Sequence, residues 1–143
     1  MTSFDRDGVH FRYPANWTAE FNDADEAGGW AITIESPGTA FLLVALRPDA
    51  DTPADLADQT LAALREEYED LEAENALQSL AARPAIGHDI DFLTLDTPIV
   101  CWTRCLDTPA GPLLVMCQTS ELDRGENEPV LRAVCASLTV VAE

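Results

Sequence analysis

A strand with alternating apolar and polar side chains runs directly into a proline near the start of the chain. The segment VHFRY (residues 9–13) places its valine, phenylalanine and tyrosine on one face, which is the pattern of a half-buried strand. Pro14 has no backbone N–H, so it ends the hydrogen-bonded ladder. Trp17 follows, where its ring can cover the open end of a core. We expect Tyr13, Pro14 and Trp17 to be structural anchors, the alternative being an exposed Trp17 that contacts a partner.

Six further segments have the pattern of strands. Residues 40–47 (AFLLVALR) are apolar on both faces, which indicates a central strand. Turn signals such as Pro-Gly and Asp-Thr-Pro separate neighbouring segments. We expect strands at residues 30–35, 40–47, 73–79, 85–95, 99–106 and 113–120, and a last extended segment at 138–141.

A first helix is expected in residues 51–71. Thr52 is a good N-cap, Pro53 suits the first helical position, and Asp55 completes a capping box. An apolar stripe at helical spacing gives the helix one buried face. The stripe consists of Leu56, Leu61, Leu64, Tyr68 and Leu71.

A second helix is expected at residues 124–138, with Asn127 as its cap and Val130, Val134 and Leu138 facing the core. The strands follow one another through hairpin-length links, which favours antiparallel pairing. We therefore predict an α+β fold. It is an antiparallel sheet of six to seven strands with two main helices packed on it, in a single domain of residues 1–143.

The charge excludes several kinds of partner. The chain carries 26 acidic residues against eight arginines, has no lysine, and has a net charge of −18. Such a field repels phosphate backbones and anionic membranes, so we expect no nucleic-acid binding and no membrane insertion. A basic protein partner is favoured. We expect no secretory signal at the N-terminus, and so a cytoplasmic location with reduced cysteines.

The segment GVHFRYPANW (8–17) resembles the start of PsbP-like domains, and ARPAIGHDIDF (82–92) is similar to a later segment of that family. The closing Ser137-Leu138 also matches, whereas Ala82 stands where the family often has glycine. This fold group includes the extrinsic photosystem protein, the Ran-binding factor Mog, DcrB-type proteins and small chaperones. The resemblance implies the α+β fold above and a tryptophan that closes the end of the sheets. The residues themselves offer no nucleophile elbow and no glycine-rich cradle, so no catalytic set is expected.

Four cysteines raise the question of a metal or thiol site. On one strand, Cys101 and Cys105 would lie about 13 Å apart, beyond the roughly 4.4–6.8 Å that a disulfide spans between α-carbons and too far for one zinc ion. Cys117 could lie across a hairpin from Cys101. We expect Cys101, Cys105, Cys117 and Cys135 to be small buried thiols, with no metal and no cofactor, a reactive thiol being the alternative.

A histidine and an acidic loop are two further candidates for chemistry. His88 alternates with apolar neighbours, so a partly buried structural histidine is expected rather than the base of a thiol dyad. The acidic loop at 22–29 offers Asp23 and Asp25, but calcium loops of the EF-hand type need further ligands where this chain has Ala27 and Ile34.

A dense acidic cluster is the most promising functional surface. It is expected at the C-terminal end of the first helix, where the helix dipole is already negative, and it comprises Glu66, Glu67, Glu69, Asp70, Glu72 and Glu74. A solvated face is one interpretation, and a docking patch for a basic protein partner is the other.

The sequence therefore predicts a non-enzymatic protein-binding or adaptor module. Three alternatives stay open: a chaperone for apolar segments of a secreted toxin, a small hydrolase or thiol enzyme, and a structural subunit of a larger assembly. A homodimer also stays open.

Overall fold

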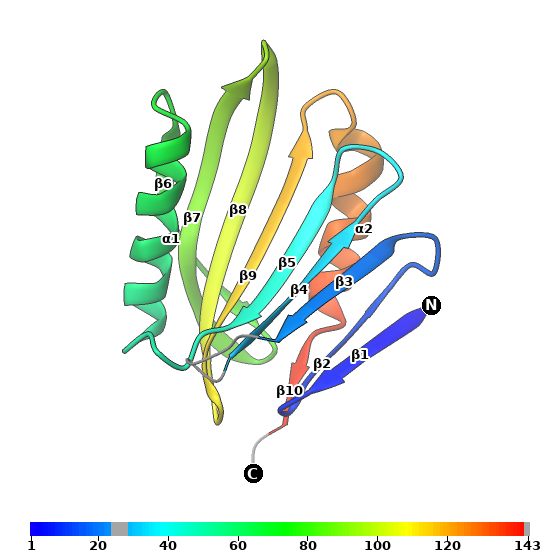
Figure 1. Cartoon of the computed structure of the whole chain (residues 1–143), viewed down its shortest axis with the longest axis vertical. Helices are drawn as coiled ribbons and strands as arrows, with labels where there is room; N and C mark the ends of the chain where they lie inside the picture. Colours follow the sequence, from blue (N-terminus) through cyan, green and yellow to red (C-terminus); the bar gives the residue numbers. More distant parts are fainter. Residues whose placement is uncertain (24–28, 142–143) are drawn as a thin grey trace.

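A computed structural model describes residues 1–23 and 29–141. Within them the chain forms ten strands and two helices (Figure 1). In chain order these are β1 (Thr2–Arg6), β2 (Val9–Tyr13), β3 (Thr18–Asp23), β4 (Trp30–Glu35), β5 (Phe41–Leu46), α1 (Pro53–Glu67), β6 (Glu72–Leu80), β7 (Arg83–Thr94), β8 (Thr97–Thr108), β9 (Gly111–Ser120), α2 (Arg124–Ala136) and β10 (Thr139–Val140).

The main sheet has seven strands in the order β3-β4-β5-β9-β8-β7-β6, and every neighbouring pair is antiparallel. A smaller sheet has the order β1-β2-β10. The predicted antiparallel α+β class is confirmed, and β5 lies inside the sheet as its two apolar faces indicated. Strands β1 and β3 were not predicted, because their residues are almost all exposed and carry no alternating pattern.

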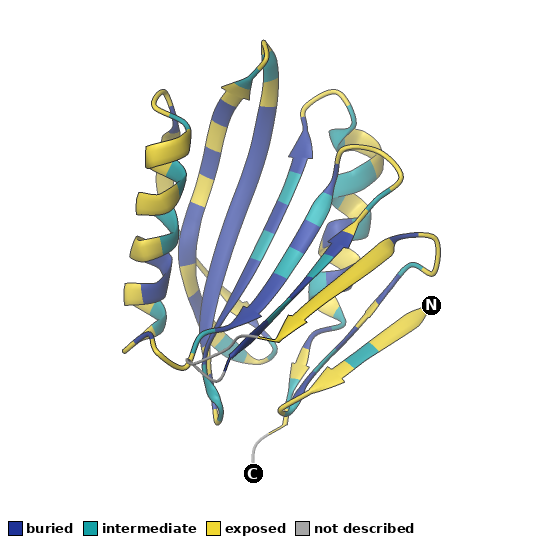
Figure 2. Cartoon of the chain, in the orientation of Figure 1, coloured by how far each residue is buried: buried dark blue, intermediate teal, exposed yellow. Residues whose placement is uncertain are grey.

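The two helices cover opposite faces of the main sheet (Figure 1). Along β9, Leu114 packs in a cluster with Leu56 and Ala57 of α1, whereas the next residue, Val115, packs in the cluster that holds Leu131 of α2. The smaller sheet packs on the α2 side. Figure 2 shows that the buried residues concentrate on the strands between these layers.

Strand β2 ends at Tyr13, directly before Pro14. The backbone turns there, and the Trp17 N–H donates to the Pro14 carbonyl at 3.1 Å. The Trp17 side chain is only 8% exposed and belongs to the core that both sheets share. This placement fits the structural reading of the Tyr-Pro-Trp segment.

Helix α1 begins as predicted but ends early. The Thr52 hydroxyl accepts a hydrogen bond from the Asp55 N–H at 3.1 Å. The helix stops at Glu67, because Tyr68 adopts an extended conformation and stacks on Phe92 of β7 at 4.0 Å between ring centroids. The expectation of a helix reaching residue 71 is therefore wrong, although the side chains of the apolar stripe still face the sheet.

Helix α2 begins at Arg124, so the expectation that Asn127 caps it is wrong. Asn127 lies inside the first turn, and its Nδ2 donates to the Thr119 hydroxyl at 3.2 Å. Leu131 and Val134 form the buried face of the helix, whereas Val130 is only half-buried.

Candidate functional site

Strand β6 is an edge strand of the main sheet, and nothing in the described part of the chain pairs with its outer side. A two-residue turn at Ala81-Ala82 joins it to β7. In such a hairpin the residues flanking the turn, Leu80 and Arg83, form a hydrogen-bonded pair, and the pairs alternate from there. Every second residue of β6 therefore directs its N–H and C=O to the open edge: Ala73, Asn75, Leu77 and Ser79.

One face of this edge carries exposed apolar side chains next to the polar Asn75 and Ser79. Leu77 is 76% exposed and Ile86, its register partner on β7, is 39% exposed. Two adjoining hollows of about 340 and 370 Å³ lie between these side chains and the N-terminal half of α1. We call this surface the β6 groove, and its lining includes Ala54, Ala57, Leu77, Pro84, Ile86 and His88.

The other face of the same edge is acidic. Glu72 lies opposite Asp91, and Glu74 lies opposite Asp89. All four side chains are exposed, and like charges directly opposite each other destabilise a sheet. Asp89 is neutralised by Arg104 of β8, because the Arg104 Nη2 donates a hydrogen bond to Asp89 Oδ1 at 2.8 Å. We call these four residues the acidic ladder.

The structure divides the predicted acidic cluster between three elements. Glu66 and Glu67 end α1, Glu69 and Asp70 form the following turn, and Glu72 and Glu74 begin β6. The expectation that all six lie at a helix C-terminus is therefore wrong, because the helix ends at Glu67.

Sequence reasoning missed two members of the ladder. Asp89 and Asp91 follow His88 in the sequence and flank Ile90. Their alternation along an expected strand was the signal that would have placed them on one face. Only the hairpin register brings them opposite the glutamates.

His88 lies beneath the β6 groove and is 7% exposed. Its backbone N–H donates to the Thr103 hydroxyl at 3.1 Å. Its Nδ1 atom is buried without a hydrogen-bond partner among residues 1–23 and 29–141. Over that same range no hydrogen bond joins His88 to a cysteine thiol, so the structure does not bring together the dyad considered from the sequence.

The cysteines lie on both sides of the sheet. Cys101 and Cys105 share β8 as expected, and burial raises the pKa of each thiol to about 12. The possible pairing of Cys117 with Cys101 across a hairpin does not occur, because Cys117 is paired with Trp102 and Cys101 with Gln118. Cys117 instead contacts Cys135 of α2, with 3.6 Å between the sulfur atoms.

The described residues contain no group of three or more His, Cys, Asp or Glu side chains that could hold a metal ion. Among them, no helix combines the length and apolar character needed to cross a membrane. Of the acidic loop, Asp23 pairs with Arg6 at 2.7 Å, while Asp25 and Ala27 lie outside the described residues.

No protein-family model matches the sequence, and no curated protein matches it. Solved structures do share its fold. Cyanobacterial PsbP (CyanoP) from Synechocystis sp. PCC 6803 superposes with a TM-score of 0.63 at 13% identity, over 98% of this chain and 92% of that one. PA94 of Pseudomonas aeruginosa, a protein of unknown function, superposes with a TM-score of 0.62 at 13% identity. The match covers 100% of this chain and 99% of that one.

LpqN of Mycobacterium tuberculosis, described as involved in cell envelope biogenesis, gives a TM-score of 0.57 at 11% identity, over 93% of this chain and 83% of that one. At such identities these likenesses show the fold alone. That fold is the one the opening segment suggested, PsbP-like.

Proposed function

We propose that this chain, which has the PsbP-like fold, is a non-enzymatic protein-binding module that takes an extended basic segment of a partner onto the open edge of β6. The observation that carries the proposal is the two-sided character of that edge. The apolar β6 groove lies on one face and the acidic ladder on the other.

A strand added to a sheet edge directs successive side chains to opposite faces. Main-chain hydrogen bonds to the outward groups of β6 supply affinity, and the side chains supply specificity. A partner segment that alternates apolar and basic residues would place the apolar ones against Leu77 and Ile86. Its basic residues would then lie over Glu72, Glu74 and Asp91.

Charge favours this partner over other occupants of the edge. The net charge of −18 raises the encounter rate with a basic segment. A second copy of this chain would bring the same acidic side chains to the edge, which disfavours a homodimer through β6. The four free thiols suit a reducing compartment, so we place the interaction in the cytoplasm.

The proposal is tested by titrating the full chain with a labelled, capped peptide in which lysine and valine alternate. Two controls have the same length: one with lysines and valines in separate blocks, and one with glutamate in place of lysine. The alternating peptide should bind, the block peptide should bind much more weakly, and the glutamate peptide should not bind. Affinity should fall as salt is raised, because the charged face is solvent-exposed.

Three variants separate the parts of the edge. Leu77→Ser removes the apolar contact and should weaken binding about tenfold. Leu95→Ser is the control and should not change the affinity, because Leu95 is 97% exposed in the turn between β7 and β8, away from the β6 groove. Glu74→Gln should weaken binding two- to fivefold at low salt, in line with the worth of about 0.2–1 kcal/mol for an exposed pair.

The third variant, Asn75→Pro, deletes an outward N–H while leaving the β6–β7 ladder intact, and it should abolish strand addition. Equal affinity for the alternating and block peptides, or no effect of Asn75→Pro in a folded variant, would contradict the proposal.

A further inference from the structure

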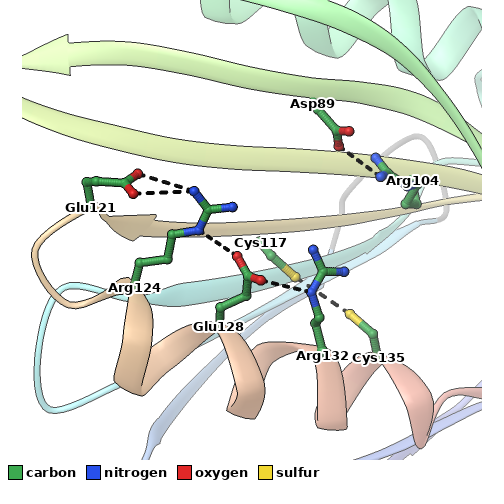
Figure 3. Close-up of polar contacts among 8 residues, drawn as sticks. All are labelled: Asp89, Arg104, Cys117, Glu121, Arg124, Glu128, Arg132 and Cys135. Atoms are coloured by element: carbon green, nitrogen blue, oxygen red, sulfur yellow. Dashed lines mark hydrogen bonds and ion pairs between the residues drawn. The ribbon is translucent and has the colours of Figure 1, made fainter.

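A pair of thiols lies in contact where α2 packs on the main sheet, on the face opposite the β6 groove. Cys117 of β9 and Cys135 of α2 have their sulfur atoms 3.6 Å apart (Figure 3). Cys101 and Cys105 pack on the α1 side of the same sheet. The fold therefore brings two of the four thiols together and keeps the other two away from them.

The two thiols differ in access to solvent. Cys117 is fully buried, whereas Cys135 is partly exposed. Cys135 lines a surface pocket of about 230 Å³ together with Gln78, Trp102, Arg104 and Arg132. A small oxidant entering this pocket would meet Cys135 first.

The pocket also carries positive charge. The Arg132 guanidinium lies over the Trp102 ring, 5.0 Å from its centroid, and Arg132 and Arg104 line the same pocket as Cys135. The hydrogen bond from Cys117 lowers the pKa of Cys135, burial opposes this effect, and the charges of Arg132 and Arg104 add to it. Burial raises the pKa of Cys117 well above its usual range. Cys135, the partly exposed member of the pair, is therefore the thiol that more readily becomes a thiolate.

We propose that Cys135 and Cys117 form a peroxide-oxidisable pair, in which Cys135 reacts with a hydroperoxide and Cys117 then closes a disulfide between α2 and β9. This inference is independent of the proposed function, because it uses neither the β6 groove nor the acidic ladder.

The chemistry balances with a hydroperoxide as the oxidant. The Cys135 thiolate attacks one peroxide oxygen, an S–O bond forms as the O–O bond breaks, and the leaving oxygen takes up the proton that the thiol lost. The Cys117 sulfur then attacks the sulfenic sulfur of Cys135. An S–S bond forms, and the hydroxyl leaves as water with the proton of Cys117. For hydrogen peroxide, the two thiols and one oxidant molecule give one disulfide and two molecules of water.

The required movement is small. A disulfide has about 2.05 Å between its sulfur atoms, so the contact must shorten by about 1.5 Å from its present 3.6 Å. Side-chain rotation of Cys135 at the end of α2 and a slight shift of that helix can supply this change.

The test treats the reduced full chain with hydrogen peroxide, then blocks the remaining thiols and maps the peptides by mass spectrometry. The free thiols should fall from four to two, and one cross-linked peptide should join Cys117 to Cys135. A reductant should restore all four. Retention of both of these thiols under peroxide that fully oxidises free cysteine would overturn the proposal, as would earlier oxidation of Cys101 or Cys105.

Three variants assign the roles. Cys117→Ser should leave a sulfenic acid on Cys135 that a dimedone probe captures, and Cys135→Ser should leave Cys117 reduced. Cys105→Ser is the matched control, because it removes a buried thiol on the other face and should leave the cross-link unchanged. If a variant fails to fold, the peptide map of the unmodified chain still decides the outcome.

Discussion

Glu72 of β6 lies directly opposite Asp91 of β7, so two exposed carboxylates face each other across an edge hairpin. The neighbouring pair, Glu74 and Asp89, repeats this arrangement, and only Asp89 has an arginine partner among the described residues. Repulsion between such pairs reduces the stability of the native fold. Basic side chains of a strand added at the open edge of β6 would relieve it.

Replacing Glu72 by lysine should convert repulsion into attraction with Asp91. We expect Glu72→Lys to raise the free energy of unfolding by about 0.2–1 kcal/mol, measured by urea denaturation at low salt. Glu20→Lys on β3 is the matched control, because Glu20 is exposed and lies opposite Thr33. The same Glu72 variant should bind the alternating lysine-valine peptide more weakly. Equal stabilisation by both substitutions would show that only the net charge matters.

The turn between β6 and β7 should become more stable with glycine. Ala81 and Ala82 have φ values of 53° and 60°, in the left-handed region where a Cβ atom costs about 1–2 kcal/mol. Ala82→Gly removes that strain at some entropic cost, so the free energy of unfolding should rise by about 0.5–1 kcal/mol. Ala110→Gly, in a turn where φ is not positive, should instead destabilise. A loss of stability in both variants would contradict the left-handed backbone conformation of Ala82.

The ion pairs along α2 should make stability depend on pH. Hydrogen bonds from Arg124, opposed by burial and assisted by Arg132, lower the pKa of Glu128 from its ordinary value of 4.5. A carboxylate with a lowered pKa in the folded state stabilises the fold above its unfolded pKa, and this contribution is lost as the pH falls through its folded pKa. The stability difference between the natural chain and Glu128→Gln should therefore shrink on acidification. A constant difference between neutral and acidic urea titrations would contradict this account.

The reactivity of Cys135 should depend on Arg132. The groups facing this thiol are Cys117 from β9, Arg104 from β8 and Arg132 from its own helix. Alkylation by iodoacetamide should modify Cys135 before the buried Cys101, and Arg132→Gln should shift the pH midpoint of that reaction upward because a positive charge is lost. Arg65→Gln, at an arginine on α1, is the control. An unchanged pH midpoint in Arg132→Gln would show that the charge of Arg132 does not affect the pKa of the Cys135 thiol.

Local sequence rules predicted the elements that depend on neighbouring residues. Pro14 ends β2, and Thr52 caps α1, because each effect acts within a few residues. Alternation and turn signals placed β7, β8 and β9 and gave the antiparallel class. The predicted end of α1 was wrong, because Tyr68 and Leu71 continue the helical spacing although the helix has already ended at Glu67.

The two proposed sites depend on contacts between segments that are far apart in the sequence. The acidic ladder exists only in the register of the β6–β7 hairpin, and the groove needs α1 to lie beside that hairpin. Cys117 and Cys135 come together only because α2 packs back onto β9. Neither the spacing of the carboxylates nor that of the cysteines along the chain contains this information.

Hydrogen exchange of the β6 amides, with and without the alternating lysine-valine peptide, tests the central claim most directly. If the peptide adds to the sheet, the outward N–H groups of Ala73, Asn75 and Leu77 gain protection, while that of Ala76, which already faces β7, changes little. If the peptide binds but those three amides continue to exchange as in the free protein, binding occurs elsewhere and the open edge of β6 is not the site.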